Sequence, residues 1–160
     1  MDEPPKILII DDDDNIRKVL VAILEDEGYN VESVGTAKEA IERTKERFYN
    51  IALIDIRLPD MEGIELLTKI RDTTPKIRKV ILTGYPTLQN AVDAVNKGAN
   101  AYILKPFDVG NVLKTIKEQL EKQKQEKKYS QDKVAEFIEA RVRELDAEKT
   151  IVHEKRRKTA

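Results

Sequence analysis

Short apolar runs alternate with longer amphipathic segments from residue 7 to about residue 120. The runs are rich in β-branched residues and too short for helices: Ile7–Ile10, Val31–Val34, Ile51–Ile54, Val80–Leu82 and Ala101–Leu104. Between them, apolar residues recur at helical spacing, as in the sets Ile16, Val19, Leu20, Ile23, Leu24 and Ile64, Leu67, Ile70. Runs that are apolar on both faces suit buried parallel strands joined by helices. The pattern predicts an α/β fold, a doubly wound five-stranded parallel sheet with a C-terminal helical extension.

Residues that start and stop helices fall between these segments. The side chains expected to cap helix starts are Asp13 or Asp14, Thr36 and Thr87. Gly28 and Gly98 stand where helices must end in a left-handed conformation. Gly63 lies near the start of the helix that contains Ile64, and we expect a larger side chain there to block the approach of the backbone to the sheet edge.

The chain after Gly110 contains neither glycine nor proline, so nothing in its sequence ends the helix expected from about Val109. The apolar positions of this helix give way to the octet Glu121–Lys128, which has nothing to bury. We place a boundary there, between a domain of residues 1–122 and a charged helical tail of residues 123–160. The tail carries a short heptad-like seam, interrupted by Lys149, at Val134, Ile138, Val142, Leu145 and Val152. Two interpretations stay open: a helix that self-associates or docks, and a linker to an output domain.

Composition excludes several classes of protein. Lys and Arg number 29 and Asp and Glu 30, so overall charge favours neither nucleic acid nor an anionic membrane. The absence of cysteine excludes a disulfide scaffold and thiolate chemistry. No apolar stretch approaches the roughly 18 to 20 residues that cross a bilayer, so we expect a cytoplasmic protein. The basic residues 155–158 do not predict DNA binding, because no second helix or wing follows them. His153, the single histidine, lies in a polar helical tail, and we expect it to have no ligand or phosphohistidine role.

Charged and hydroxyl side chains follow the predicted strands. They are Asp11 and Asp12 after the first strand, Asp55 after the third, Thr83 after the fourth and Lys105 after the fifth. If the strand order is 2-1-3-4-5, the first and third strands are neighbours at the point where ligands bind open sheets, and three carboxylates meet there. Such close like charges repel unless a cation joins them, and oxygen ligands of this kind suit Mg²⁺.

This arrangement suits phosphoryl chemistry. Asp55 could attack phosphorus and become an aspartyl phosphate. Thr83 could donate a hydrogen bond to one phosphoryl oxygen while Lys105 neutralises another. We predict a cis Lys105–Pro106 bond, because only bonds that precede proline adopt cis cheaply and a sharp turn would direct the lysine inward.

The same residues lie in four stretches that resemble a known family. The stretches are Ile7-Leu-Ile-Ile-Asp-Asp-Asp, Leu53-Ile-Asp-Ile-Arg-Leu-Pro-Asp-Met-Glu-Gly, Val80-Ile-Leu-Thr-Gly-Tyr and Ala101-Tyr-Ile-Leu-Lys-Pro-Phe. Any one stretch alone would be weak evidence. All four in this order and spacing resemble the receiver domain of two-component response regulators, a family that includes the chemotaxis switch protein. The resemblance extends from about Lys6 to Lys122, and no position of the family pattern is missing.

The resemblance implies a role for each site residue. Asp55 would accept phosphate from a phosphohistidine of a sensor histidine kinase or phosphotransfer protein. Asp12 would ligate Mg²⁺ directly and Asp11 through water, with the main-chain carbonyl of Arg57 as a further ligand.

It also implies a two-state switch. Thr83 would move toward the phosphoryl group and Tyr102 would turn inward, which would remodel the surface of the fourth helix, fifth strand and fifth helix. The signal would pass to an unknown downstream target or to a second copy of the chain. Arg57 and Tyr85 lie where family side chains tune hydrolysis of the phosphate.

Two other functions remain open. A metal-dependent phosphatase of the haloacid dehalogenase type also forms an aspartyl phosphate, but its nucleophile follows the first strand in an Asp-x-Asp-x-Thr-like motif. Here the run from Asp11 to Asn15 lacks the threonine. The second alternative is a constitutive interaction module whose acids are only structural.

Overall fold

A computed structural model describes residues 3–84 and 86–159 of the chain, with side chains as far as Val152. In these residues, five parallel strands form one sheet in the order β2-β1-β3-β4-β5. The strands are β1 (Lys6–Ile10), β2 (Asn30–Val34), β3 (Ile51–Asp55), β4 (Arg78–Thr83) and β5 (Ala101–Leu104). The helices are α1 (Asp14–Asp26), α2 (Ala37–Glu46), α3 (Gly63–Lys69), α4 (Leu88–Asn96) and α5 (Val109–Thr159). The predicted fold class and strand order are confirmed.

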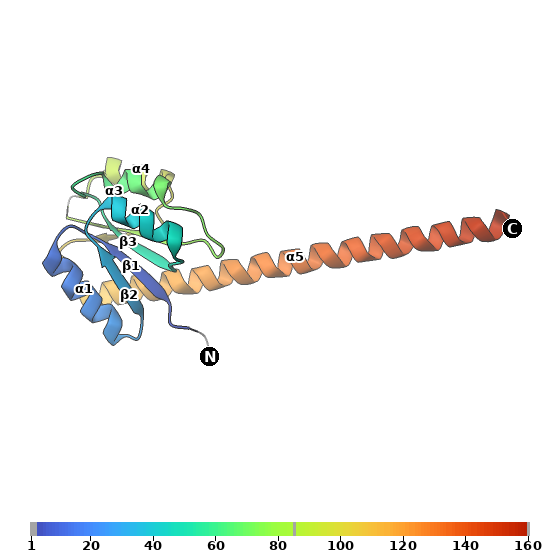
Figure 1. The fold of residues 1–160 in the computed structure, drawn as a ribbon, viewed down its shortest axis with the longest axis horizontal. Coiled ribbons are helices and arrows are strands. Elements are labelled where there is room, and N and C mark those ends of the chain that lie inside the picture. The colour runs from blue at the N-terminus through green and yellow to red at the C-terminus, as the bar shows by residue number, and fades with distance from the viewer. Residues whose placement is uncertain (1–2, 85, 160) are drawn as a thin grey trace. The chain divides into compact units, whose positions relative to one another are not determined.

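Helices cover both faces of the sheet (Figure 1). Along β1, Leu8 and Ile10 point into a core shared with α2, α3 and α4. Ile7 and Ile9 point the opposite way, into a core shared with α1 and the first turns of α5. Because side chains alternate along a strand, burial on both faces explains why the run is apolar throughout.

The predicted helix signals are present. Asp13 caps α1, where its carboxylate accepts two backbone N–H groups, and Thr36 and Thr87 cap α2 and α4 through their hydroxyl oxygens. Gly28 and Gly98 have φ angles of 92° and 104°, the left-handed conformation expected after α1 and α4.

The amino ends of the strands meet α5 through side-chain amides. Gln123 Nε2 donates to the main-chain oxygens of Asn50 and Lys76 at 3.1 and 2.9 Å, and its Oε1 accepts from Asn50 Nδ2 at 2.9 Å. Gln123 is 3% exposed, so the expectation that the octet Glu121–Lys128 buries nothing is wrong at this residue. The apolar pattern missed it because a buried amide is satisfied by hydrogen bonds instead of by apolar contacts.

One turn earlier, Gln119 makes a similar connection. Its Oε1 accepts from Arg78 Nε at 3.0 Å, and its Nε2 donates to the main-chain oxygen of Asn100 at 3.4 Å. The side chain of Asn100 in turn accepts from the backbone N–H of Lys79 at 2.8 Å. Two glutamines of α5 are therefore hydrogen-bonded to Arg78 of β4 and to residues just before β3, β4 and β5, which joins α5 to the amino edge of the sheet.

The chain divides into two compact units, Met1–Lys124 and Gln125–Ala160. The second unit is helical through Thr159, and no helix among the described residues is long and apolar enough to cross a membrane. Its apolar side chains are exposed: Tyr129, Val134, Phe137, Ile138, Val142, Leu145, Ile151 and Val152.

Candidate functional site

Three carboxylates gather at the carboxyl edge of the sheet, where β1 and β3 are neighbours. Asp11 follows β1 directly and Asp55 ends β3, and the two strands pair in register as far as Ile10 and Ile54. One oxygen each of Asp11, Asp12 and Asp55 lie within 4.8 Å of one another. Asp11 is 1% exposed and Asp55 9%, whereas Asp12 is exposed. The structure thus brings the predicted acids together, with access from the side of Asp12.

Lys105 reaches the same acids from the end of β5. Its Nζ lies 2.9 Å from Asp11 Oδ2 and 3.5 Å from Asp55 Oδ1. Its backbone N–H donates to the main-chain oxygen of Thr83 at 2.7 Å, and its bond to Pro106 is cis, as predicted. The ammonium group of Lys105 therefore contacts two of the three carboxylates.

The pKa values of Asp55 and Lys105 are both raised. Burial, and then the charge of Asp11, raise the pKa of Asp55, and this outweighs the opposing effects of Lys105 and the Arg57 N–H group. Burial lowers the pKa of Lys105, but its hydrogen bond to Asp11 and the charges of Asp11 and Asp55 outweigh that effect, so its pKa is raised overall. Lys105 stays cationic at neutral pH, and the carboxylates leave an excess of negative charge.

This donor set fits a hard divalent cation. Carboxylate oxygens are the ligands that Mg²⁺ prefers, and a second cation beside Lys105 would relieve the repulsion that raises the pKa of Asp55. Arg57 lies close to the acids, since its backbone N–H donates to Asp55 Oδ1 at 3.4 Å.

Gly63 allows the start of α3 to pass against the backbone of Asp55. Its N–H donates to the main-chain oxygen of Ile56 at 2.8 Å, and a Cβ added to it would lie only 2.1 Å from the main-chain oxygen of Asp55. A side chain would therefore push the loop after β3 away from its place. This contact gives a physical reason for the glycine expected at the position.

Thr83 and Tyr102 lie on the neighbouring strands β4 and β5. Thr83 is fully buried at the end of β4, one residue beyond Leu82, which pairs with Asp55. The Tyr102 ring packs against the core on the α4 side. Its hydroxyl is buried without a hydrogen-bond partner within the described residues, and burial raises its pKa. Two residues considered in the sequence, Tyr85 and the side chain of His153, lie outside the described part.

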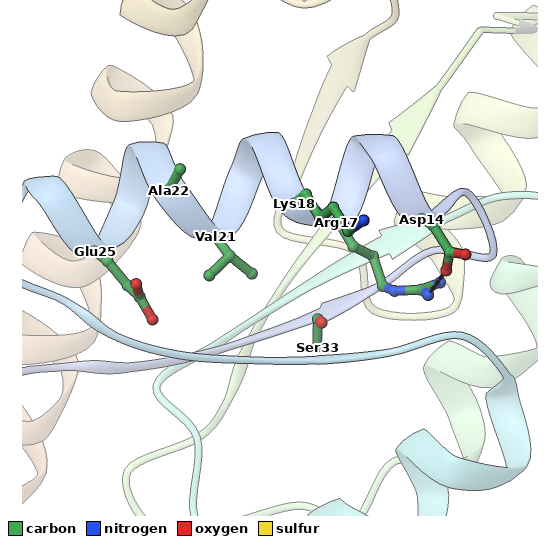
Figure 2. Close-up of a pocket in the computed structure, with 7 residues that line it drawn as sticks. All are labelled: Asp14, Arg17, Lys18, Val21, Ala22, Glu25 and Ser33. Carbon is green, nitrogen blue, oxygen red and sulfur yellow. Dashed lines mark hydrogen bonds and ion pairs between the residues drawn. The ribbon is translucent and has the colours of Figure 1, made fainter.

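Arg17 supports the acidic loop and was not predicted from the sequence. Its guanidinium donates to the main-chain oxygen of Asp11 and pairs with Asp14. Figure 2 shows this pair at one end of a groove of about 450 Å³ between α1 and β2. A Cβ on Gly35 would lie 3.0 Å from Arg17 Nη1, so the arginine occupies space that a side chain there would fill. An arginine one turn into a helix carries no sequence signal for this contact.

Asp60 is a second residue that the sequence did not assign. Its two carboxylate oxygens accept the backbone N–H groups of Ala37 and Lys38, each at 2.9 Å, and these bonds lower its pKa. Asp60 thereby connects the loop after β3 to the start of α2, where Thr36 also caps. The quoted motif contains Asp60, but only the tertiary fold shows which helix it caps.

A family model described as the response regulator receiver domain matches residues 7–117. The chain belongs to this family. Receiver domains are signalling domains, so membership decides against the haloacid dehalogenase alternative.

Curated relatives share this receiver domain. The transcriptional regulatory protein ZraR of Escherichia coli O157:H7 is 36% identical over 114 residues, which are 71% of this chain and 26% of that protein. The C4-dicarboxylate transport transcriptional regulatory protein DctD of Rhizobium meliloti (strain 1021) is 33% identical over 124 residues, or 78% and 27% of the two chains. The chain thus spans about a quarter of the length of these relatives.

Solved structures share the fold. A CheY-like receiver domain protein from Methanospirillum hungatei JF-1 is 46% identical, with a TM-score of 0.74 over 77% of this chain and 98% of that one. The beryllofluoride-activated NtrC4 receiver domain dimer is 35% identical, with a TM-score of 0.70 over 74% and 98%.

Proposed function

We propose that this receiver domain accepts a phosphoryl group on Asp55 from the phosphohistidine of a sensor histidine kinase or phosphotransfer protein, and that it acts as a phosphorylation-controlled switch. The observation that carries the proposal is the cluster of Asp11, Asp12 and Asp55 with Lys105 at the point where strand order reverses. A purely structural edge would gain little from Asp55, because burial and the charge of Asp11 raise the pKa of this carboxyl group.

The transfer is a substitution at phosphorus. An oxygen of the Asp55 carboxylate forms the new bond to phosphorus while the bond from phosphorus to the imidazole nitrogen breaks, and that bond's electron pair stays on the imidazole. Lys105, 3.5 Å from Asp55 Oδ1, is placed to neutralise charge on the phosphoryl oxygens. Thr83 would donate its hydroxyl to another of these oxygens.

We propose Mg²⁺ as the cofactor of this reaction. Asp12 and Asp55 would ligate it directly and Asp11 through water, with the main-chain carbonyl of Arg57 as a further ligand. When bound, the ion supplies positive charge that lets an anionic phosphoryl group approach an anionic carboxylate.

The switch would run from Thr83 to Tyr102 and on to the surface of α4, β5 and α5. Tyr102 supports this route, because its buried hydroxyl has no partner within the described residues to hold it in one position. Exposed apolar side chains on the same surface, Leu88 on α4 and Leu104 on β5, suit a partner that is bound in one state and released in the other. Arg57 and Tyr85 would set the rate at which water hydrolyses the phosphate.

The relatives indicate the kind of output. ZraR and DctD are named as transcriptional regulatory proteins, and the NtrC4 receiver is described as an activated dimer. We propose a cytoplasmic protein that signals to a downstream protein target or to a second copy.

The direct test is intact-mass spectrometry of the full chain after incubation with phosphoramidate, which carries a P–N bond, and Mg²⁺. We expect a gain of one phosphoryl group, loss of that gain with EDTA, and no gain in Asp55→Asn. The matched control, Asp26→Asn, removes an exposed carboxylate at the end of α1 and should accept phosphate normally. Phosphorylation of Asp55→Asn would contradict the assignment. Failure of the wild-type chain to gain phosphate or bind beryllofluoride would favour the constitutive module.

A further inference from the structure

The second unit presents an apolar seam to solvent. If Val142 and Lys149 take the a positions of a heptad, then Ile138, Leu145 and Val152 take the d positions. These four apolar residues are 41 to 56% exposed along a continuous helix. A helix with such a stripe gains stability when the stripe is buried against a partner.

The charges beside the seam favour one orientation of a second copy. In this register the e positions from 132 to 146 are acidic, namely Asp132, Glu139 and Asp146, and the g positions are mixed, with Lys127 and Arg141 basic, Val134 apolar and Glu148 acidic. A parallel pair places each g residue beside an e residue of the next heptad, so Arg141 meets the partner's Asp146 and Lys127 meets the partner's Asp132. An antiparallel pair would instead set acidic e positions against one another.

The core residues of the central heptad favour two strands, whereas the other d residues, Ile138 and Val152, are β-branched and do not share that preference. A β-branched residue at a with leucine at d, as in Val142 and Leu145, is the combination preferred by parallel dimers. A lysine at a single a position, here Lys149, fixes register and oligomeric state at some cost in stability. Val134 at g and Phe137 at c widen the apolar stripe on one side, where they would cover the edge of the core.

We propose that residues 131–152 form a parallel, in-register, two-stranded coiled coil with a second copy of this chain. The inference depends on the second unit alone and does not require phosphorylation of Asp55. It assigns the tail to self-association and predicts the residues that touch.

Light scattering on the full chain with a concentration series tests the interface. We expect a molar mass that rises to twice the 18.3 kDa of one chain. Ile138→Asp should raise the dissociation constant about a hundredfold or more, because it removes two buried side chains per dimer and places acids in the core. Ala140→Asp is the matched control on the far face of the same helix and should change it less than about threefold. A monomer at every concentration, or an Ile138→Asp variant that dimerises as well as the wild type, would overturn the proposal.

Single cysteines test the orientation, since the chain contains none of its own. Gln131→Cys and Val152→Cys occupy d positions that are 21 residues apart, about 32 Å along a helix. In a parallel dimer each variant alone should form a disulfide-linked dimer under mild oxidation, while Ala147→Cys on the far face should not. If neither variant links alone but a mixture of the two does, the helices are antiparallel and the proposed register is wrong.

A charge reversal adds an independent readout. Arg141→Glu should weaken the dimer about tenfold, because it faces the partner's Asp146 in the proposed register. Adding Asp146→Arg to that variant should restore most of the affinity. A double variant as weak as the single one would show that these two positions do not meet.

Discussion

The two edges of the sheet differ in how their buried polar groups are paired. At the carboxyl edge, Asp11 and Asp55 share one lysine, Lys105, and the pKa of Asp55 is raised by burial and by Asp11. At the amino edge, the side chains of Asn50 and Gln123 bind each other and nearby main-chain groups, and Gln119 accepts a hydrogen bond from Arg78. The first edge is left with negative charge that a ligand would neutralise, and the second is complete as it stands.

The polar groups of the amino edge stabilise the fold, whereas those of the carboxyl edge are arranged for binding at a cost in stability. A buried amide network that is fully paired contributes to stability, and removing one member leaves its partners unsatisfied. A cluster of like charges does the reverse, because removing one member relieves repulsion. Substitutions at the two edges should therefore change stability in opposite directions, except where the backbone itself is tightly packed.

The largest effect on stability should come from the tight backbone contact between Gly63 and Asp55 at the carboxyl edge. Gly63→Ala would place a Cβ 2.1 Å from the main-chain oxygen of Asp55, so the loop after β3 must move. We expect a loss of about 3 kcal/mol in the free energy of unfolding, measured with urea. Gly110→Ala is the control, because its Cβ would meet Asp108 Oδ1 at 3.4 Å and alanine favours helix, so it should cost less than about 0.5 kcal/mol. Equal losses in the two variants would show that the contact with Asp55 does not matter.

At the amino edge, Gln123→Leu should destabilise the receiver domain by about 2 kcal/mol. It keeps a buried side chain of similar size but removes three hydrogen bonds, so Asn50 Nδ2 and the main-chain oxygen of Lys76 lose the partner that Gln123 provides. Gln125→Leu, two residues further along α5 and exposed, should change stability by less than about 0.5 kcal/mol. The comparison is by urea unfolding at neutral pH, and a stable Gln123→Leu variant would show that the amide network contributes little.

The sequence predicted the carboxyl edge far better than the amino edge. Acids, a hydroxyl and a lysine at strand ends are visible in the sequence because each follows a short apolar run, and parallel topology brings strand ends together. Gln119 and Gln123 have no such signal, since an amide in a charged helix looks solvated until its partners on other strands are known. Arg17 and Asp60 were missed for the same reason.

Apolar periodicity was also incomplete as a guide to burial. Val19 has the helical spacing of its neighbours Leu20 and Leu24, yet it is 48% exposed while both leucines are fully buried. A helix that covers one face of a sheet buries only a narrow stripe, so the flanking apolar position stays in solvent.

In contrast to Gln123→Leu, Asp55→Asn should stabilise the metal-free domain, by about 1 kcal/mol or less at neutral pH. It removes a buried carboxylate that Asp11 repels. A carboxyl group whose pKa is raised in the folded state favours folding below its unfolded pKa and loses that contribution as pH rises through the folded value. The advantage of asparagine should therefore shrink as the pH falls.

Thermal unfolding of both proteins across a pH series would measure this difference, with Asp26→Asn as the exposed control. Added Mg²⁺ should raise the melting temperature of the wild type more than that of Asp55→Asn, since one ligand is gone. A destabilised Asp55→Asn variant would mean that the Asp55 contact with Lys105 outweighs repulsion, and the contrast between the two edges would fail.

The smallest effect should come from Asp60, a carboxylate of the same loop that is exposed and well paired. The N–H groups of Ala37 and Lys38 lower its pKa, so its stabilising contribution is present above its unfolded pKa and is lost as the pH falls through the folded value. Because solvent screens it, we expect Asp60→Asn to cost only a few tenths of a kcal/mol at neutral pH and nothing at low pH. Hydrogen exchange of the amides at the start of α2 provides the sensitive measurement. If Asp60→Asn left the exchange of these amides unchanged at neutral pH, the charge of Asp60 would have no part in holding the loop to α2. Hydrogen bonding would then not distinguish Asp60 from Asp55, and the two carboxylates would differ in burial alone.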